Sequence, residues 1–162
     1  MLLGLAILVV LLIGLIDRTP IGEQTFFNDM MHRIDVTRLE NNGASQLKAG
    51  WTKVNITPGY SMPMAGYIPR DHFDTVHDSL YARILVIEND GFRAAMIDVD
   101  LLIFPPLLRD KIYEHTDSST FLYLSATHTH NGVGGWDPSI GGRLITGSFN
   151  EEYVDDIAGR IR

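Results

Sequence analysis

Cysteine is absent from the 162 residues of this sequence. The absence excludes disulfide bonds and metal sites built from thiolates, although it leaves the cellular compartment open. Positive charge is also scarce, since 13 Lys and Arg residues are outnumbered by 20 Asp and Glu residues and the net charge is -7. Without a basic stripe to neutralise phosphates, we expect no nucleic-acid partner. The length suits one domain with a real hydrophobic core.

The first 16 residues carry no charge and form an unbroken apolar run. As a helix this run spans roughly 24 Å, slightly less than the ~30 Å hydrocarbon core of a bilayer. It lacks the basic n-region and small-residue cleavage site of a secretory signal. We therefore predict a membrane anchor or uncleaved signal-like helix over 1–16, with the remainder extracytoplasmic, on the periplasmic or cell-surface side. A buried core helix is the alternative, and Arg18 argues against this orientation.

Residues 17–46 are interpreted as a spacer. They contain a weak helical pattern over 23–39 and then a polar break over 41–46. The compact part is expected to begin at residue 47 and to extend to residue 162. We interpret this part as one domain.

The compact part alternates between strand and helix patterns. Strands are predicted over 49–55, 80–88, 92–99 and 121–126, the second and third joined by a hairpin turn at Asn89-Asp90-Gly91. Helices are predicted over about 105–115 and from about 148 to the last residue, and the glycine-rich residues 137–147 are expected to be mobile without substrate. The fold class is therefore α/β, a mixed β-sheet layered with helices. We expect it to be incomplete because the chain stops within the last helix, and to be preceded by the N-terminal hydrophobic helix.

Two histidines follow the strand predicted over 121–126, which is apolar enough to be buried on both faces. Because extended backbone repeats every two residues, His128 and His130 should point to the same side. Gly132, Gly134 and Gly135 then allow a sharp turn and the close approach of a ligand or another backbone. The histidines could be two zinc ligands, or one ligand beside an acid, base or substrate contact, or hydrogen-bonding residues at a strand end. A metallo-β-lactamase-like site is excluded, since Asp-His does not follow.

Charged residues on neighbouring strands are further candidates. Asp98 and Asp100 lie on one face of a strand, so each requires a cation, a metal or a hydrogen-bond donor, and a structural ion pair is the first interpretation. Arg83 is expected to pair with one of them. His77 is expected to be an ordered loop histidine near the site.

A family resemblance rests on these residues. The segment Ala-Thr-His-Thr-His-Asn-Gly-Val-Gly-Gly at 126–135 resembles the motif Ala-Thr-His-Thr-His-Ser-Gly-Pro-Gly-Gly of the neutral/alkaline, non-lysosomal ceramidases. Asn131 and Val133 depart from it in the turn. Further segments resemble the family in the same order, from about residue 47 to the end. These are residues 49–57, 64–67, 76–83, 99–101 and 148–150.

The resemblance implies a hydrolase that acts on a linear amide bond, and it makes residues 47–162 the N-terminal part of a ceramidase-like catalytic domain. It assigns one Zn²⁺ to His128 and a catalytic role beside the metal, in contact with substrate, to His130. The remaining zinc ligands, a further His, a Glu and a Tyr, are expected beyond residue 162. The implied reaction is hydrolysis of the N-acyl bond of ceramide to a sphingoid base and a fatty acid. Possible second-shell or substrate contacts are His77, Arg83, Asp100, Asn131, Gly132, Gly134 and Gly135.

The implied partners are a ceramide-like lipid substrate and a membrane reached through the N-terminal helix. On its own this portion is expected to be inactive, because half of the zinc site is missing. Two alternatives stay open. The chain could be a non-catalytic lipid- or protein-binding module that keeps the histidines as structure, or a hydrolase of the same scaffold that cleaves another amide or an ester.

Overall fold

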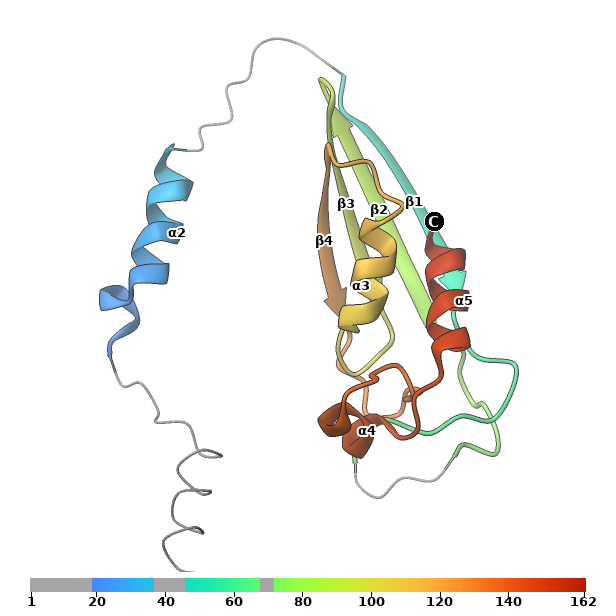
Figure 1. Cartoon of the computed structure of the whole chain (residues 1–162). Helices are drawn as coiled ribbons and strands as arrows, with labels where there is room; N and C mark the ends of the chain where they lie inside the picture. The colour runs from blue at the N-terminus through green and yellow to red at the C-terminus, as the bar shows by residue number, and fades with distance from the viewer. Residues whose placement is uncertain (1–18, 37–45, 68–71) are drawn as a thin grey trace, which may run out of the picture. The chain divides into compact units, whose positions relative to one another are not determined.

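The computed structural model describes residues 19–36, 46–67 and 72–162 (Figure 1). The predicted anchor over 1–16 lies outside the described residues. The polar break predicted over 41–46 also lies outside them, except for its last residue. The chain divides into two compact units, residues 1–43 and residues 44–162, and this division falls within the predicted spacer.

Residues 19–36, the described part of the first unit, contain a short helical turn and an α-helix. The turn η1 covers Ile21–Glu23 and the helix α2 covers Thr25–Val36, so the weak helical pattern of the sequence does correspond to a helix. Within this unit, Phe26, Met30 and Ile34 of α2 are largely exposed. Across residues 19–36, 46–67 and 72–162, no helix is both long and apolar enough to cross a bilayer.

The second unit is built on a mixed four-stranded sheet, as the sequence predicted. Its strands are β1 (Lys48–Asn55), β2 (Tyr81–Asn89), β3 (Phe92–Val99) and β4 (Thr120–Ala126). The spatial order is β1-β2-β3-β4. Both β1–β2 and β2–β3 are antiparallel, whereas β3 and β4 are parallel and are connected through α3 (Pro106–Tyr113). The strand-helix-strand connection brings the ends of β3 and β4 to the same edge, where the site lies.

The β2–β3 hairpin turns at the residues that the sequence indicated. Asp90 has φ +48° and Gly91 has φ +82°. Two successive positive φ values are typical of the tight turn whose twist matches that of the flanking strands, and Asp-Gly is a favoured composition for it. This turn fixes the register in which Arg83 of β2 lies opposite Asp98 of β3.

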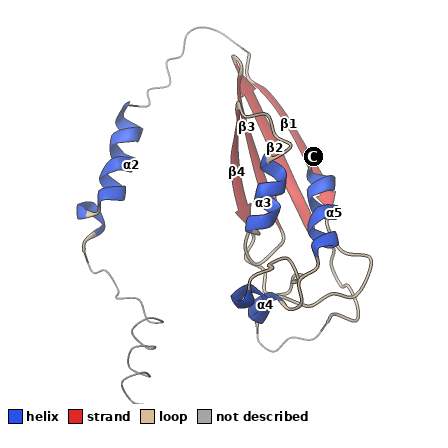
Figure 2. Cartoon of the chain, in the orientation of Figure 1, coloured by secondary structure: helices blue, strands red, loops and turns tan. Residues whose placement is uncertain are grey.

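Helices cover one face of the sheet. Figure 2 shows α3 and α5 (Glu151–Ile161) on the same side of the strands, and their apolar residues form the core with the inward side chains of β2, β3 and β4. The residue that caps the start of α5 is Asn150, whose side chain accepts a hydrogen bond from the Tyr153 amide, so the helix begins three residues later than predicted. Core residues include Ile84, Ile97, Val99, Leu108, Ile112, Leu122, Val154 and Ile157.

The opposite face of the sheet is open to solvent in the described structure. A row of apolar side chains crosses all four strands there, formed by Trp51, Leu85, Met96 and Tyr123. The prediction that the strand over 121–126 is buried on both faces is therefore wrong, since Phe121 and Tyr123 are more than half exposed. On the face of the strand that packs against the helices, Leu122 is buried, as predicted.

The glycine-rich region after the site is partly helical. The helix α4 covers Ile140–Thr146 and begins at Ser139, whose hydroxyl accepts a hydrogen bond from the Gly142 amide. It ends at Gly147, which has φ +80°. The sequence predicted only a mobile segment here, because the glycine content concealed these helix-capping residues.

Candidate metal site at the end of strand β4

The paired histidines lie immediately beyond β4, in a segment held by backbone bonds to the end of β3. The Thr127 amide donates to the Val99 carbonyl at 3.0 Å, and the Thr129 amide donates to the Leu101 carbonyl at 3.3 Å. Between these two bonds, His128 has φ +57°, in the left-handed region that few non-glycine residues occupy. Hydrogen bonds thus fix the backbone on both sides of His128, and His128 itself has a left-handed conformation.

The two imidazoles converge, although not for the reason that the sequence suggested. The strand ends at Ala126, so alternation along extended backbone does not orient residues 128 and 130. The left-handed conformation of His128 brings the rings together instead. Their centroids are 5.0 Å apart with planes at 79°, and the Nε2 atoms of His128 and His130 are 3.4 Å apart.

The other ring nitrogen of His128 is held by the protein. Its Nδ1 lies 2.7 Å from the Leu102 carbonyl oxygen, which can only accept, so Nδ1 carries the proton. The lone pair of His128 is therefore on Nε2, the atom directed toward His130. A second-shell carbonyl that fixes the tautomer in this way is the usual arrangement for a metal-binding histidine.

This geometry fits a zinc ion. Two nitrogen ligands at about 2.0–2.1 Å from a tetrahedral zinc lie about 3.4 Å from each other, and the two Nε2 atoms are separated by that distance. Within the described ranges, no group of three or more His, Cys, Asp or Glu side chains is placed to hold a metal. The described residues thus offer at most two protein ligands of a catalytic zinc, which usually has about three.

The glycines after the histidines allow close backbone packing. The Gly134 amide donates to the Pro63 carbonyl and the Gly135 amide to the Thr146 carbonyl, each at 2.6 Å. A Cβ atom on Gly134 would collide with the Thr146 carbonyl, and Gly135 has φ +73°. Of the two roles considered for these glycines, approach by another backbone is the one that the structure contains.

The loop that carries Gly66 and Tyr67 packs against His130. The Tyr67 ring lies 4.6 Å from the His130 ring, and Gly66 with φ +105° brings backbone against the same imidazole. The Ala65 amide donates to the Gly132 carbonyl at 3.0 Å, which joins this loop to the glycine-rich turn. Its Met-Ala-Gly-Tyr sequence, already noted as part of the resemblance, was the signal that could have identified it.

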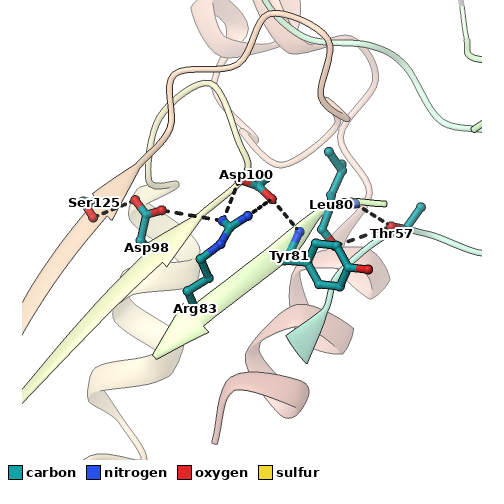
Figure 3. A network of polar contacts seen from close by, with 7 residues as sticks. All are labelled: Thr57, Leu80, Tyr81, Arg83, Asp98, Asp100 and Ser125. Carbon is teal, nitrogen blue, oxygen red and sulfur yellow. Dashed lines mark hydrogen bonds and ion pairs between the residues drawn. The ribbon is translucent and has the colours of Figure 1, made fainter. Parts of the chain in front are cut away.

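The predicted ion pair of Arg83 is present and involves both candidate carboxylates (Figure 3). The guanidinium donates two hydrogen bonds to Asp100, at 2.8 and 3.1 Å, and lies 3.8 Å from Asp98. Asp98 also accepts a bond from the Ser125 hydroxyl of β4 at 2.8 Å. Asp100 in addition accepts the Tyr81 amide at 2.9 Å.

These contacts keep Asp100 ionised. Burial raises the pKa of its carboxyl, but hydrogen bonds from Arg83, the Tyr81 amide and the Thr127 side chain, together with the Arg83 charge, outweigh burial and lower it below the ordinary value. The side chain of Asp100 is 16% exposed, against 38% for Asp98. Asp100 is thus the more enclosed of the two carboxylates and the one connected to the residue before His128.

His77 and Asn131 line a cavity to which the imidazole pair does not contribute. Its volume is about 480 Å³, Phe73, Leu80 and Val133 make it largely apolar, and neither His128 nor His130 is among the described residues that line it. The His77 side chain is almost fully exposed and its Nδ1 lies 2.9 Å from Asp78. That hydrogen bond, and then the charge of Asp78, raise the pKa of His77. The cavity adjoins the glycine-rich turn through Asn131 and Gly132.

Comparison with known proteins identifies similar folds. The crystal structure of neutral ceramidase from Pseudomonas aeruginosa superposes on this chain with a TM-score of 0.63 at 24% identity, covering 74% of this chain and 21% of that one. A ceramidase complexed with C2 superposes with a TM-score of 0.63 at 25% identity, covering 72% and 20%. No family model and no curated protein matches the sequence.

The described fold is therefore ceramidase-like, and the chain spans about a fifth of the length of these two structures. The similarity agrees with the resemblance seen in the residues around the histidine pair.

Proposed function

We propose that this chain carries part of the active site of a zinc-dependent amide hydrolase that cleaves the N-acyl bond of ceramide. The observation that carries the proposal is the 3.4 Å separation of the His128 and His130 Nε2 atoms, within a fold similar to that of neutral ceramidases. A zinc ion bound there would supply Lewis acidity and a water of lowered pKa. Support thus comes from donor geometry and from fold.

His128 would hold the metal. Its Nδ1–H donates to the Leu102 carbonyl, which fixes the ring orientation and increases the basicity of Nε2. The contact occurs together with the left-handed backbone at residue 128, and such strained conformations are common at functional sites.

His130 would hold or transfer a proton at Nε2 beside the metal and would contact the substrate. The Tyr67 ring and the backbone at Gly66 fix the His130 ring from the side of Nδ1. An amide hydrolase must protonate the leaving amine, and an imidazole is suited to do so near neutral pH. The Nε2 separation also matches a pair of zinc ligands, so the two roles of His130 are distinguished by metal-binding experiments.

We also propose that the protein is attached to a membrane and lies outside the cytoplasm, on the basis of its sequence alone. This proposal is supported by the apolar composition of residues 1–16, which lie outside the described part of the structure. Fractionation of cells that express the protein, with and without those residues, tests it.

Zinc binding tests the proposal on the chain itself. We expect calorimetric titration to show one zinc ion bound per chain, and His128→Asn to abolish binding while the fold is kept, because Asn tolerates a positive φ. His115→Ala, in an exposed position beyond α3, is the matched control and should bind as the wild type does. Equal zinc binding by all three proteins would contradict the proposed ligand.

Activity is tested on the protein in its natural, complete form. Chelation should abolish release of fatty acid from ceramide, and added zinc should restore it. Ceramide hydrolysis that survives complete removal of zinc would overturn the proposal. The non-catalytic alternative is supported by the two-histidine donor set of the described residues, and it would be favoured if metal binds but neither ceramide nor another amide or ester is hydrolysed.

A further inference from the structure

The position of the His128 ring depends on the residues that follow β3. Carbonyl groups of this segment bind the histidine segment at three points: Val99 accepts the Thr127 amide, Leu101 accepts the Thr129 amide, and Leu102 accepts the ring nitrogen of His128. A shift of residues 99–102 would therefore move the imidazole directly.

Asp100 lies in the middle of that segment and is fixed on several sides. Its backbone amide donates to the Tyr81 carbonyl at 2.9 Å, and its carboxylate accepts the Tyr81 amide at 2.9 Å. Arg83 adds two charge-assisted bonds to the same carboxylate (Figure 3). The Thr127 side chain is a weaker donor to the same carboxyl and helps to lower its pKa. The carboxylate thus connects β2 with the end of β3, where the Val99 carbonyl accepts the amide of the residue that precedes His128.

We propose that Asp100, held by Arg83, is a positioning residue for the metal-binding imidazole of His128. It acts through the backbone of residues 99–102 and through Thr127, and it touches neither the metal nor the substrate. The inference rests on the proposed function only where zinc affinity is the quantity measured. The geometry of the metal-free ring is a separate readout.

Asp98 provides a matched control within the same network. It lies on the same strand and faces the same guanidinium, at 3.8 Å. Its hydrogen bond goes to Ser125, inside the sheet, rather than to a residue adjoining the histidines. Loss of its charge should therefore disturb Arg83 without moving residues 99–102.

The first experiment uses the metal-free chain. Long-range ¹H–¹⁵N spectra of the imidazoles report which nitrogen of His128 carries the proton. We expect the wild type and Asp98→Asn to show protonated Nδ1, and Asp100→Asn to show a mixture of tautomers. Thr127→Val, which keeps the shape of residue 127 and removes its hydroxyl, should shift the His128 signals in the same direction and supplies the test if Asp100→Asn does not fold.

The second experiment titrates the same four proteins with zinc. Loss of a second-shell group typically weakens metal binding by about 10- to 100-fold, and we expect at least about tenfold for Asp100→Asn and less than twofold for Asp98→Asn. An unchanged His128 tautomer in folded Asp100→Asn and Thr127→Val would overturn the inference, as would equal effects of the two Asp→Asn changes. Absence of zinc from the complete protein would instead contradict the proposed function, while the tautomer comparison would still decide the positioning role.

Discussion

At the scale of single residues, the site depends on backbone conformations that side chains rarely adopt. His128 has φ +57° and Gly66 has φ +105°, and each brings one imidazole into place. Left-handed backbone costs a non-glycine residue roughly 1–2 kcal/mol, so His128 is held there by its neighbours. The carbonyls of Val99, Leu101 and Leu102 are the contacts that do so.

The substitution Gly66→Ala should displace His130. A Cβ atom at residue 66 would lie 2.5 Å from His130 Nδ1, and the positive φ is unfavourable for alanine. We expect a loss of more than about 1 kcal/mol in the free energy of unfolding, measured by urea denaturation, with shifted His130 resonances. Gly59→Ala is the control, since a Cβ atom there meets nothing within 4 Å. Equal effects at both positions would show that Gly66 is not a packing constraint on His130.

The charge of Asp100 should make stability depend on pH. The pKa of its carboxyl is lower in the folded chain than in the unfolded chain, so its stabilisation is fully present above the unfolded value and is lost as pH falls through the folded value. Asp100→Asn should therefore lower the free energy of unfolding by about 1–3 kcal/mol at pH 7. Below about pH 4 the difference should shrink. A difference that stays constant between pH 7 and pH 3 would contradict this assignment.

The partners of charged residues were predictable from the sequence where a charge in an apolar strand requires a nearby counter-charge. The Asp98, Asp100 and Arg83 cluster followed from carboxylates in an apolar strand that require a cation, and the structure contains it. The orientation of the histidines was not predictable, because it depends on one left-handed residue rather than on strand alternation. The contact of Tyr67 with His130 joins residues 63 positions apart in sequence, and spacing alone gives no sign of it.

At the scale of elements, α5 is fixed to the sheet by two side chains. The Tyr153 hydroxyl donates to the Ile56 carbonyl at 3.0 Å, and Arg160 donates to the Asn55 carbonyl at 2.8 Å. Burial raises the pKa of Tyr153, so its hydroxyl keeps the donated proton at all ordinary pH values. The two bonds satisfy carbonyl groups of the last residue of β1 and of the residue that follows it.

Removal of that hydroxyl should weaken the attachment of the helix. Tyr153→Phe leaves the Ile56 carbonyl without its donor in a buried place, and we expect a loss of about 1–3 kcal/mol in the free energy of unfolding. Tyr113→Phe, at an exposed tyrosine of α3, should change it by less than about 0.5 kcal/mol. Chemical denaturation of the three proteins measures both values, and a Tyr153→Phe variant as stable as wild type would contradict the role of this bond.

Elements with strong periodicity were predicted well and those with mixed signals were not. The strands over 80–88 and 92–99 and their turn match β2 and β3 within one residue, because alternation and Asp-Gly act together. The helix α4 was missed because two of its seven residues are glycine, and its stability depends on the Ser139 cap. The exposed face of β4 was missed because an apolar run does not show whether a second layer covers it.

At the scale of the whole molecule, the chain contains a ceramidase-like sheet with helices on one face and, among the described residues of the second unit, an exposed apolar row on the other. The histidine pair lies at the edge where β3 and β4 end together, as ligand sites do where parallel strands of an α/β sheet end. The proposed chemistry depends on one ion bound between groups that this edge positions.

The most direct test of that claim is the ¹⁵N chemical shift of His128 Nε2 while one equivalent of zinc is added to the chain at neutral pH. We predict a saturable change at His128 Nε2, with Nδ1 remaining protonated against the Leu102 carbonyl. We also predict a simultaneous change at His130 and none at His115. A His128 ring that does not respond to zinc, or that binds it through Nδ1, would contradict the proposed metal site.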